Sequence, residues 1–262
     1  MKVICCQLNI VWENKLANHV KVTALLRRAA PPEGSLIIFP EMFATGFSMN
    51  VAAITDSASH QTEEFLARMA ADYRVFILGG VVNTGSDGRG RNECIAFSPA
   101  GAQIERYCKL HPFTFGGEAE HYTAGCDIKV FHAGEFSIAP FICYDLRFPE
   151  IFRAAVRRGA NLFVVIANWP TPRDDHWTAL LKARAIENQA YAVGVNRCGN
   201  DPRHFYLGHS VIFDPRGHIV AEAGTEEGII SADLDLPALI RYRQEFPVIE
   251  DMRVDEINAE LS

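Results

Sequence analysis

The amino-acid sequence predicts an α/β protein built as a four-layer αββα sandwich with internal pseudo-two-fold symmetry. Two observations lead to this prediction. Short apolar runs rich in Val, Ile and Phe alternate with helix-like stretches along the 262-residue chain, which is typical of α/β layering. Several segments of the first half also have counterparts in the second half. Because no Gly/Ser linker divides the chain, we expect one domain over residues 1–262.

The first half reads as strand, helix, strand, helix and strand. VICCQLNI has the pattern of a buried strand, and a helix is expected near residues 14–30. SLIIFPE follows as the second strand, a helix is expected near residues 60–72, and RVFILGGVVN forms the third strand. Cys5 and Cys6 lie inside the first apolar run, so we expect both to be small core residues.

The second half repeats this order. ECIAFSPAGAQIERYCK resembles HSVIFDPRGHIVAEAG, since each has a strand, a tight Pro-x-Gly turn and a returning strand. Upstream of these hairpins, VFILGGVVN resembles YAVGVNR and SLIIFPE resembles NLFVVIAN. The period is too long for a solenoid repeat. We therefore expect two halves that pair their sheets and carry their helices outside.

Composition narrows the class of protein. The net charge of −7 argues against a nucleic-acid binder, which usually carries a basic patch. No apolar run approaches the ~20 residues of a membrane span. The first residues, MKVICCQLNI, lack the features of a signal peptide. The seven cysteines are scattered without a C-x-x-C pair, so we expect a cytoplasmic protein with free thiols and without a zinc site.

Cys143 is the cysteine in the most informative context. FSIAPFIC is an apolar strand that ends at this residue, and Pro149 suits the first turn of a helix that follows. A strand-to-helix turn presents a side chain outward from the edge of a sheet, and a nearby helix N-terminus favours the reactive thiolate. Cys143 is therefore a candidate nucleophile, and a buried structural cysteine is the alternative.

Glu41 and Lys109 also stand at the ends of predicted strands. Glu41 ends SLIIFPE, and Lys109 closes the returning strand QIERYCK. A thiol nucleophile needs a proton acceptor and a group that stabilises an oxyanion, and none of the nine histidines sits in a context that suggests a Cys–His pair. A carboxylate, an ammonium and a thiol at three strand ends could converge for amide hydrolysis. An exposed loop carboxylate and a surface lysine are the alternatives.

These residues lie in segments that resemble the three catalytic blocks of the nitrilase, or carbon–nitrogen hydrolase, superfamily: FPEMFATGF, YCKLHPF and FICYDLRFPE. Their order and spacing also match, with 68 residues from Glu41 to Lys109 and 34 from Lys109 to Cys143. The resemblance extends over nearly the whole chain. Within the superfamily, EMFATGFSMN, GEAEHYTAG and NWPTPRDDHW look most like the bacterial omega-amidases.

The resemblance implies a cysteine-dependent amidase that hydrolyses the terminal amide of 2-oxoglutaramate or 2-oxosuccinamate. Glu41 would accept the thiol proton as Cys143 attacks the amide carbon, while Lys109 and the backbone N–H of Tyr144 would stabilise the oxyanion. Glu41 would then protonate departing ammonia, and water would release the acid from the thioester. The small-molecule amide is the expected partner, and no metal or organic cofactor is required.

A second glutamate in this family lies seven residues before a glycine and positions the substrate and the lysine. Counting back from Gly125 gives Glu118, and Glu120 is close enough to be its rival. An acidic loop in solvent is the alternative interpretation of both residues.

Substrate contacts are expected from loops near these strand ends. Arg173 follows the strand NLFVVIAN, whose tip the internal repeat equates with the Glu41 tip. It is a candidate for binding a substrate carboxylate in a bidentate pair, and a solvent-exposed arginine is the alternative. Trp169 and Phe115 are candidate pocket walls.

Two further arginines are expected to form ion pairs. Arg147 is expected to pair with Asp145 or Glu150. Arg184 stands three residues before Glu187 on a predicted helix, so a local pair is expected there.

Other functions are compatible with the sequence. A related enzyme would hydrolyse a different small amide or an N-carbamoyl amino acid by the same chemistry. A catalytically silent binding module is another class, although it would have no need for all three of Glu41, Lys109 and Cys143. A redox-sensing thiol protein is a third option, but no resolving cysteine is apparent.

The resemblance also implies a homodimer that pairs helical faces. The C-terminal segment, about residues 234–262, begins LDLPALIRYRQEFPVIEDM. It is apolar enough to pack across such an interface.

Overall fold

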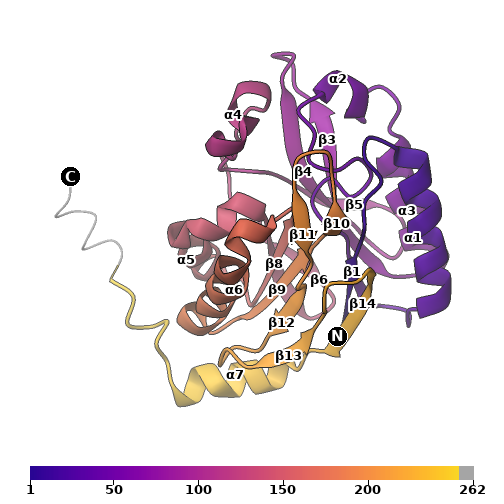
Figure 1. Ribbon diagram of the computed structural model, residues 1–262. Helices are drawn as coiled ribbons and strands as arrows, with labels where there is room; N and C mark the ends of the chain where they lie inside the picture. Colours follow the sequence, from indigo (N-terminus) through magenta and orange to yellow (C-terminus); the bar gives the residue numbers. More distant parts are fainter. Residues whose placement is uncertain (254–262) are drawn as a thin grey trace.

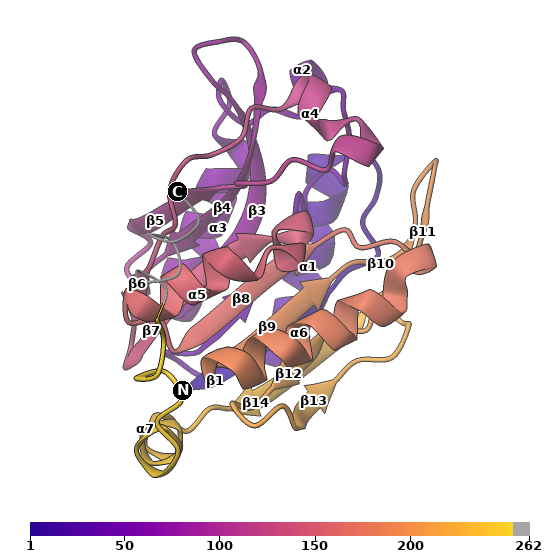
Figure 2. The same cartoon turned by 90° about the vertical axis from the view of Figure 1, so that its left-hand side faces the viewer.

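Two six-stranded sheets lie face to face in the computed structural model, which describes residues 1–253, and helices cover both outer sides (Figure 1). α1 (Lys15–Ala29) and α3 (Gln61–Tyr73) cover the first sheet, and α5 (Pro149–Arg157) and α6 (Asp174–Asn188) cover the second (Figure 2). The predicted four-layer αββα sandwich is confirmed.

Each sheet is built mainly from one half of the chain. The first has the order β14 (Gly228–Asp233), β1 (Lys2–Gln7), β2 (Leu36–Ile38), β3 (Phe76–Thr84), β4 (Gly90–Phe97) and β5 (Gln103–Cys108). The second has the order β13 (Ile219–Glu222), β12 (Val211–Phe213), β9 (Tyr191–Asn196), β8 (Leu162–Ala167), β7 (Phe136–Ile142) and β6 (Phe131–Ala133).

The strand pairing repeats between the halves. β1, β2 and β3 are parallel neighbours, and β4 and β5 continue the sheet antiparallel. β7, β8 and β9 are likewise parallel, and β12 and β13 continue antiparallel. β14 pairs antiparallel with β1, and β6 pairs antiparallel with β7. The internal symmetry predicted from the hairpins is confirmed.

The core has separate layers on the two faces of the first sheet. Cys5 belongs to the cluster between the sheets, whereas Cys6 belongs to the cluster beneath α1 and α3. Consecutive side chains of a strand point to opposite faces. Since a core cluster covers each face of this sheet, both cysteines are buried, as predicted. Because both faces of each sheet are covered, the central strands read as near-continuous apolar runs.

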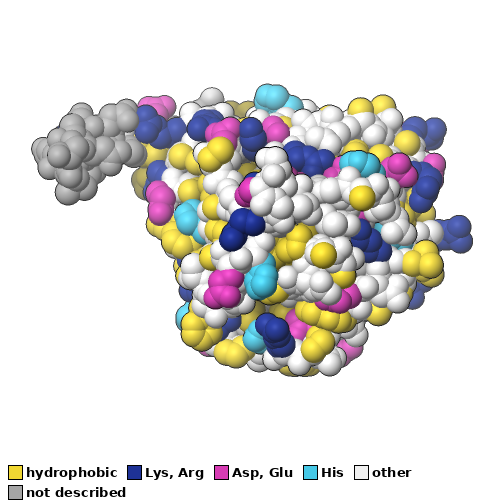
Figure 3. Space-filling model, turned by 90° about the horizontal axis from the view of Figure 1, so that it is seen from above, with side chains coloured by type: hydrophobic (Ala, Val, Ile, Leu, Met, Phe, Trp, Pro, Cys, Tyr) yellow, Lys and Arg dark blue, Asp and Glu magenta, His cyan; other side chains and the backbone are white. Residues whose placement is uncertain are grey.

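Short elements gather at one end of the sandwich or link its layers: α2 (Val51–Ile54), α4 (Glu118–His121), the 3₁₀ turns η1 (Thr114–Gly116), η2 (Cys143–Arg147) and η3 (Thr171–Arg173), and the small sheet of β10 (Cys198–Asn200) and β11 (Phe205–Leu207). On the face seen from above, basic, acidic and histidine side chains are interspersed with hydrophobic ones (Figure 3). Within residues 1–253, no helix is long and apolar enough to cross a membrane.

The C-terminal helix α7 (Leu236–Glu245) lies beyond the second sheet in Figure 1. It buries Leu239 but leaves Ile240 and, just after the helix, Phe246 exposed. Residues 254–262, the last part of the segment expected at a dimer interface, lie outside the described residues.

Candidate active site

Three of the predicted site residues follow the ends of strands at one edge of the sandwich: Glu41, Lys109 and Cys143. Lys109 follows β5 directly, Cys143 follows β7 directly, and Glu41 comes three residues after β2. Lys109 Nζ lies 3.0 Å from Glu41 Oε1. The sulfur of Cys143 lies 3.8 Å from the carbonyl oxygen of Asn168, and the N–H of Asn168 donates to Glu41 Oε2 at 2.8 Å. The structure thus brings the three predicted side chains together.

Glu118 completes this cluster from the first residue of α4. Its Oε2 lies 2.7 Å from Lys109 Nζ and accepts the backbone N–H of Phe113 at 2.6 Å. Its side chain is fully buried, whereas Glu120 on the same short helix is exposed. Of the two predicted rivals, the structure therefore places Glu118 beside the lysine.

The cluster keeps its lysine charged. Burial alone would lower the pKa of Lys109, but Glu118 and Glu41 hold it above its ordinary value. Burial raises the pKa of Glu118, and contact with Lys109 opposes that rise. A charged ammonium held between two carboxylates can also stabilise a developing oxyanion.

Cys143 sits at a strained turn. Its φ of 48° is in the left-handed region, which non-glycine residues seldom adopt and which often marks functional sites. Burial, and then the charge of Glu41, raise its pKa well above the ordinary value. The expected thiolate preference is therefore wrong for the resting state, because desolvation outweighs any helix terminus and α5 begins only at Pro149. The protonated thiol requires a base.

Asp145 fixes this turn. Its Oδ2 accepts the N–H of Ile142 at 3.0 Å and the hydroxyl of Tyr107 at 2.7 Å, and its Oδ1 accepts the N–H of His111 at 3.0 Å. Arg184 supports the same turn by donating to the carbonyl oxygen of Leu146 at 2.8 Å.

Arg184 also forms the ion pair that was predicted from its spacing. Its Nη1 lies 3.0 Å from Glu187 Oε1.

Two asparagines outside the predicted set bind the glutamates. The side-chain amide of Asn168 donates to the carbonyl oxygen of Glu41 at 2.7 Å. Asn92, on β4, donates to Oε1 of both Glu41 and Glu118, at 2.7 and 2.8 Å. Comparing the strand tips of the two halves could have indicated Asn168, which follows the counterpart of the Glu41 strand. Asn92 carries no such signal, because its partners lie 51 and 26 residues away.

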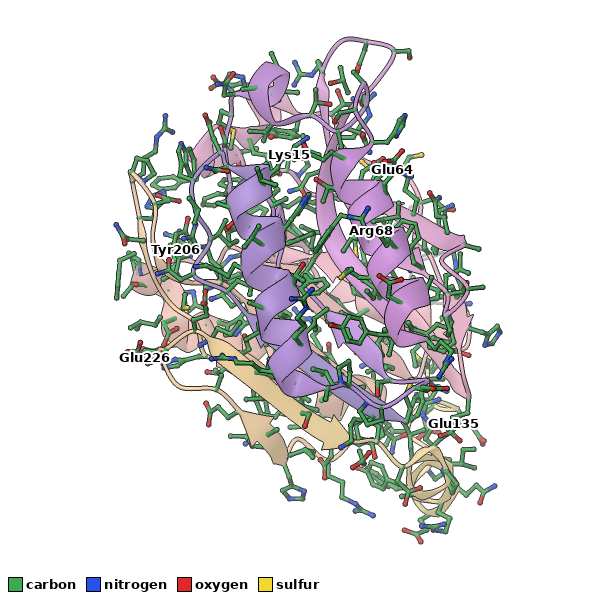
Figure 4. The ribbon with its side chains drawn as sticks, turned by 90° about the vertical axis from the view of Figure 1, so that its right-hand side faces the viewer. Lys15, Glu64, Arg68, Glu135, Tyr206 and Glu226 are labelled. Atoms are coloured by element: carbon green, nitrogen blue, oxygen red, sulfur yellow. The ribbon has the colours of Figure 1, made fainter. Side chains whose placement is uncertain are left out.

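A pocket opens beside Cys143, and its walls match the predictions only in part. Trp169 and Arg173 both line it. Phe115 does not, because the η1 turn points its ring outward and leaves it 86% exposed. Phe113 lines the pocket instead. The small sheet of β10 and β11 contributes Tyr206, which was not predicted (Figure 4 labels it).

Three arginines line this pocket, Arg147, Arg173 and Arg203, and none of them forms an ion pair with a carboxylate among residues 1–253. Arg147 lies 4.7 Å from the centroid of the Trp169 ring, and Arg173 lies 5.4 Å from that of Phe113. Burial, and then the charge of Arg173, lower the pKa of Arg147. The predicted ion pair of Arg147 with Asp145 or Glu150 is wrong, because the Asp145 oxygens already bind the turn.

A four-layer αββα sandwich with a buried Glu–Lys–Glu cluster beside a pocket cysteine defines the class as a nitrilase-type amidase. The carbon-nitrogen hydrolase family model matches residues 2–244. The chain belongs to the carbon–nitrogen hydrolase family and hydrolyses carbon–nitrogen bonds of amides other than peptides.

Individual relatives agree with this membership. The chain is 33% identical to a 2-oxoglutaramate amidase of Bacillus subtilis, over 97% of this chain and 98% of that protein. It is 39% identical to the omega-amidase YafV of Yersinia enterocolitica, over 96% of each. Among solved structures, a CN-hydrolase superfamily protein from Xanthomonas campestris superposes with a TM-score of 0.90 at 32% identity, covering 96% of this chain and 97% of that one.

Proposed function

We propose that this amidase is an omega-amidase that converts 2-oxoglutaramate or 2-oxosuccinamate into the 2-oxo dicarboxylate and ammonia. The observation that carries the proposal is the buried Glu41–Lys109–Glu118 cluster beside Cys143, at a pocket lined by arginines that have no carboxylate partner among residues 1–253. Relatives named as 2-oxoglutaramate amidase and omega-amidase, at 33% and 39% identity, support this substrate class.

In the first half of the reaction, Glu41 takes the thiol proton while the sulfur of Cys143 bonds to the amide carbon. Negative charge moves to the carbonyl oxygen, where the Lys109 ammonium and the backbone N–H of Tyr144 stabilise it. The raised pKa of Cys143 makes this base necessary. When the C–N bond breaks, Glu41 returns the proton to the departing nitrogen, and ammonia leaves a thioester on Cys143.

In the second half, water enters the site vacated by ammonia. Glu41 accepts a proton from the water as its oxygen bonds to the thioester carbon, and the same donors stabilise the second oxyanion. The C–S bond then breaks, Glu41 returns the proton to the sulfur, and the acid leaves. The net reaction consumes one water and needs neither oxidant nor reductant.

The pocket arginines support a substrate that carries a carboxylate away from its amide. Arg147 and Arg173 lie against aromatic rings and lack carboxylate partners among residues 1–253. An anionic substrate would supply that partner, and a planar guanidinium binds a carboxylate through two parallel hydrogen bonds. The single carboxylate of 2-oxoglutaramate, at the far end from the amide, meets this requirement.

An ammonia-release assay across a substrate panel tests the proposal. The panel contains 2-oxoglutaramate, 2-oxosuccinamate, glutamine, asparagine and N-carbamoyl amino acids. We expect the highest kcat/KM for the two oxo-acid amides. Highest activity on glutamine, asparagine or an N-carbamoyl amino acid would replace the omega-amidase assignment with a different amidase of the same family.

A further inference from the structure

Asn92 occupies a position that the steps above do not use. Its side chain is buried on β4, and its backbone carbonyl accepts the N–H of Lys109 at 2.9 Å. Its amide nitrogen faces Glu41 and Glu118 together, while its Oδ1 is buried without a hydrogen-bond partner in the described structure. The opposite amide orientation would place Oδ1 against two carboxylates. The carboxylates therefore fix how this side chain is turned.

Asn92 and Lys109 bridge the same two carboxylates. Glu41 Oε1 accepts from Lys109 Nζ at 3.0 Å and from Asn92 Nδ2 at 2.7 Å. Glu118 accepts Lys109 on Oε2 at 2.7 Å and Asn92 on Oε1 at 2.8 Å. The four groups form a closed ring of N–H donors and carboxylate acceptors. The ring occupies two of the three ammonium protons of Lys109, which leaves one for a substrate oxygen.

Burial raises the pKa of Glu118, and the neighbouring charge of Glu41 adds to this rise. Like charges in contact disfavour double ionisation, whereas hydrogen bonds to the charged forms favour it. Lys109 supplies one such bridge and Asn92 supplies the other. Without Asn92, Glu118 Oε1 would lose the only side-chain donor found for it in residues 1–253, and the pair would take up a proton more readily.

Other ionisable groups also face this ring. Lys109 reaches it from the end of β5, Cys143 from η2, Tyr122 from the end of α4 and Tyr206 from β11. Burial raises the pKa of both tyrosines, and of Cys143, above their ordinary values. Since Lys109 stays charged, a proton taken up as the pH falls goes to one of the glutamates.

We propose that Asn92 is a positioning residue that keeps Glu41 and Glu118 ionised side by side, so that Glu41 can accept the thiol proton. The inference rests on the proposed function, in which Glu41 is the base. It predicts a change in the pH dependence of the reaction and not merely a slower enzyme. Removing both donors with Asn92→Leu should move the acid limb of kcat/KM upward by about one to two pH units.

The chain offers a matched control on the neighbouring strand β3. Asn83 Nδ2 also bridges two glutamates, Glu63 and Glu93, at 2.8 Å to each. These residues do not line the pocket beside Cys143. Asn83→Leu therefore removes an equivalent bridge outside the site, and it should leave the acid limb where it lies in the wild type.

The experiment measures kcat/KM for ammonia release across about pH 5 to 9 in wild type, Asn92→Leu, Asn92→Ser and Asn83→Leu. Asn92→Ser keeps one donor, so it should give a smaller upward shift, and it serves if the Leu variant does not fold. In parallel, the rate of Cys143 alkylation by iodoacetamide is followed on its peptide by mass spectrometry, so that exposed Cys126 does not contribute. The alkylation profile should shift in the same direction.

Upward shifts in both Asn92 variants, with the Asn83→Leu profile unchanged, would support the inference. Asn92 profiles that keep the wild-type midpoint and differ only in height would overturn it, because a purely structural role lowers the rate at every pH. If the wild type hydrolyses no amide in the panel, the proposed function fails, and the alkylation profile still decides the role of Asn92.

Discussion

In the proposed mechanism, Cys143 is prepared for attack by its geometry and not by a low pKa. Its backbone is held in the left-handed region, the carboxylate of Asp145 fixes the turn, and burial keeps the thiol protonated. Motif spacing predicted Glu41, Lys109, Cys143 and Glu118, because these side chains stand next to recognisable strand ends. It missed Asn92, whose role depends only on contacts between distant segments, and it misplaced Phe115, because local pattern does not show which way a turn points a ring.

Arg173→Ala should raise KM for 2-oxoglutaramate by about ten-fold or more, because a hydrogen bond to a charged group is worth roughly 1.5–3 kcal/mol. KM for an uncharged aliphatic amide should change much less. Steady-state kinetics on both substrates measure the difference, with Arg216→Ala as a surface control. Equal effects on the two substrates would remove Arg173 from carboxylate binding.

At the scale of elements, the segment that carries Glu41 depends on its neighbour β3. β2 ends at Ile38, earlier than the strand predicted from SLIIFPE, because the chain continues through Pro40, which cannot donate to the ladder. The turn with Glu41 then packs directly on Gly80 of β3, where a Cβ would lie 2.3 Å from the nitrogen of Met42 and 2.7 Å from the Cα of Glu41. By contrast, the start of α5 at Pro149 was predictable from local sequence alone.

Gly80→Ala should displace Glu41 and lower kcat by about ten-fold or more, since misplacement of a catalytic group by 1 Å can cost about a hundred-fold. The neighbouring substitution Gly79→Ala is the control. A Cβ there would meet side-chain atoms at 3.4 Å, an ordinary contact distance. Equal kcat values for the two variants would show that the close approach to Glu41 does not matter.

The α1–α3 layer contains an acid-sensitive contact. His19 of α1 stacks on Phe65 of α3 with ring centroids 4.2 Å apart. Burial lowers its pKa from 6.5 to about 4; Asp56 opposes this shift, while Lys15 and Arg68 add to it. Figure 4 shows the two helices side by side, with Lys15 and Arg68 labelled. The unfolded chain binds this proton near pH 6.5 and the folded protein only near pH 4, so the free energy of unfolding falls as the pH drops through that window.

His19→Phe removes this proton-binding site, so its stability should depend less on pH between about 6.5 and 4. Between about pH 6.5 and 4, the free energy of unfolding of the wild type should fall by roughly 3 kcal/mol more than that of the variant. Urea unfolding at several pH values measures it, and exposed His218→Phe serves as the control. Parallel pH dependence of wild type and His19→Phe would contradict the assignment.

At the scale of the whole molecule, the repeated strand order made the fold predictable. Alternating apolar runs and two similar hairpins indicated two equivalent sheets. The order of β1 to β5 in the first sheet corresponds to the order of β7, β8, β9, β12 and β13 in the second. The short sheet of β10 and β11 was not predicted. Its strands are short, and its place beside the pocket depends on how the two halves meet.

The homodimer remains a prediction at this scale. Light scattering on the purified protein should give twice the chain mass of 29.1 kDa. Phe246, which is 58% exposed just after α7, offers a test of the expected C-terminal interface. Phe246→Asp should shift the mass toward the monomer, and an unchanged dimer would place the interface elsewhere.

The most direct test of the central claim compares ammonia release from 2-oxoglutaramate by wild type, Cys143→Ala and Cys126→Ala. Cys126 is an exposed free cysteine, so its replacement controls for loss of a thiol as such. We predict full activity in Cys126→Ala and none in Cys143→Ala, with unchanged thermal unfolding in both. Retained turnover in folded Cys143→Ala would contradict thioester chemistry at this site.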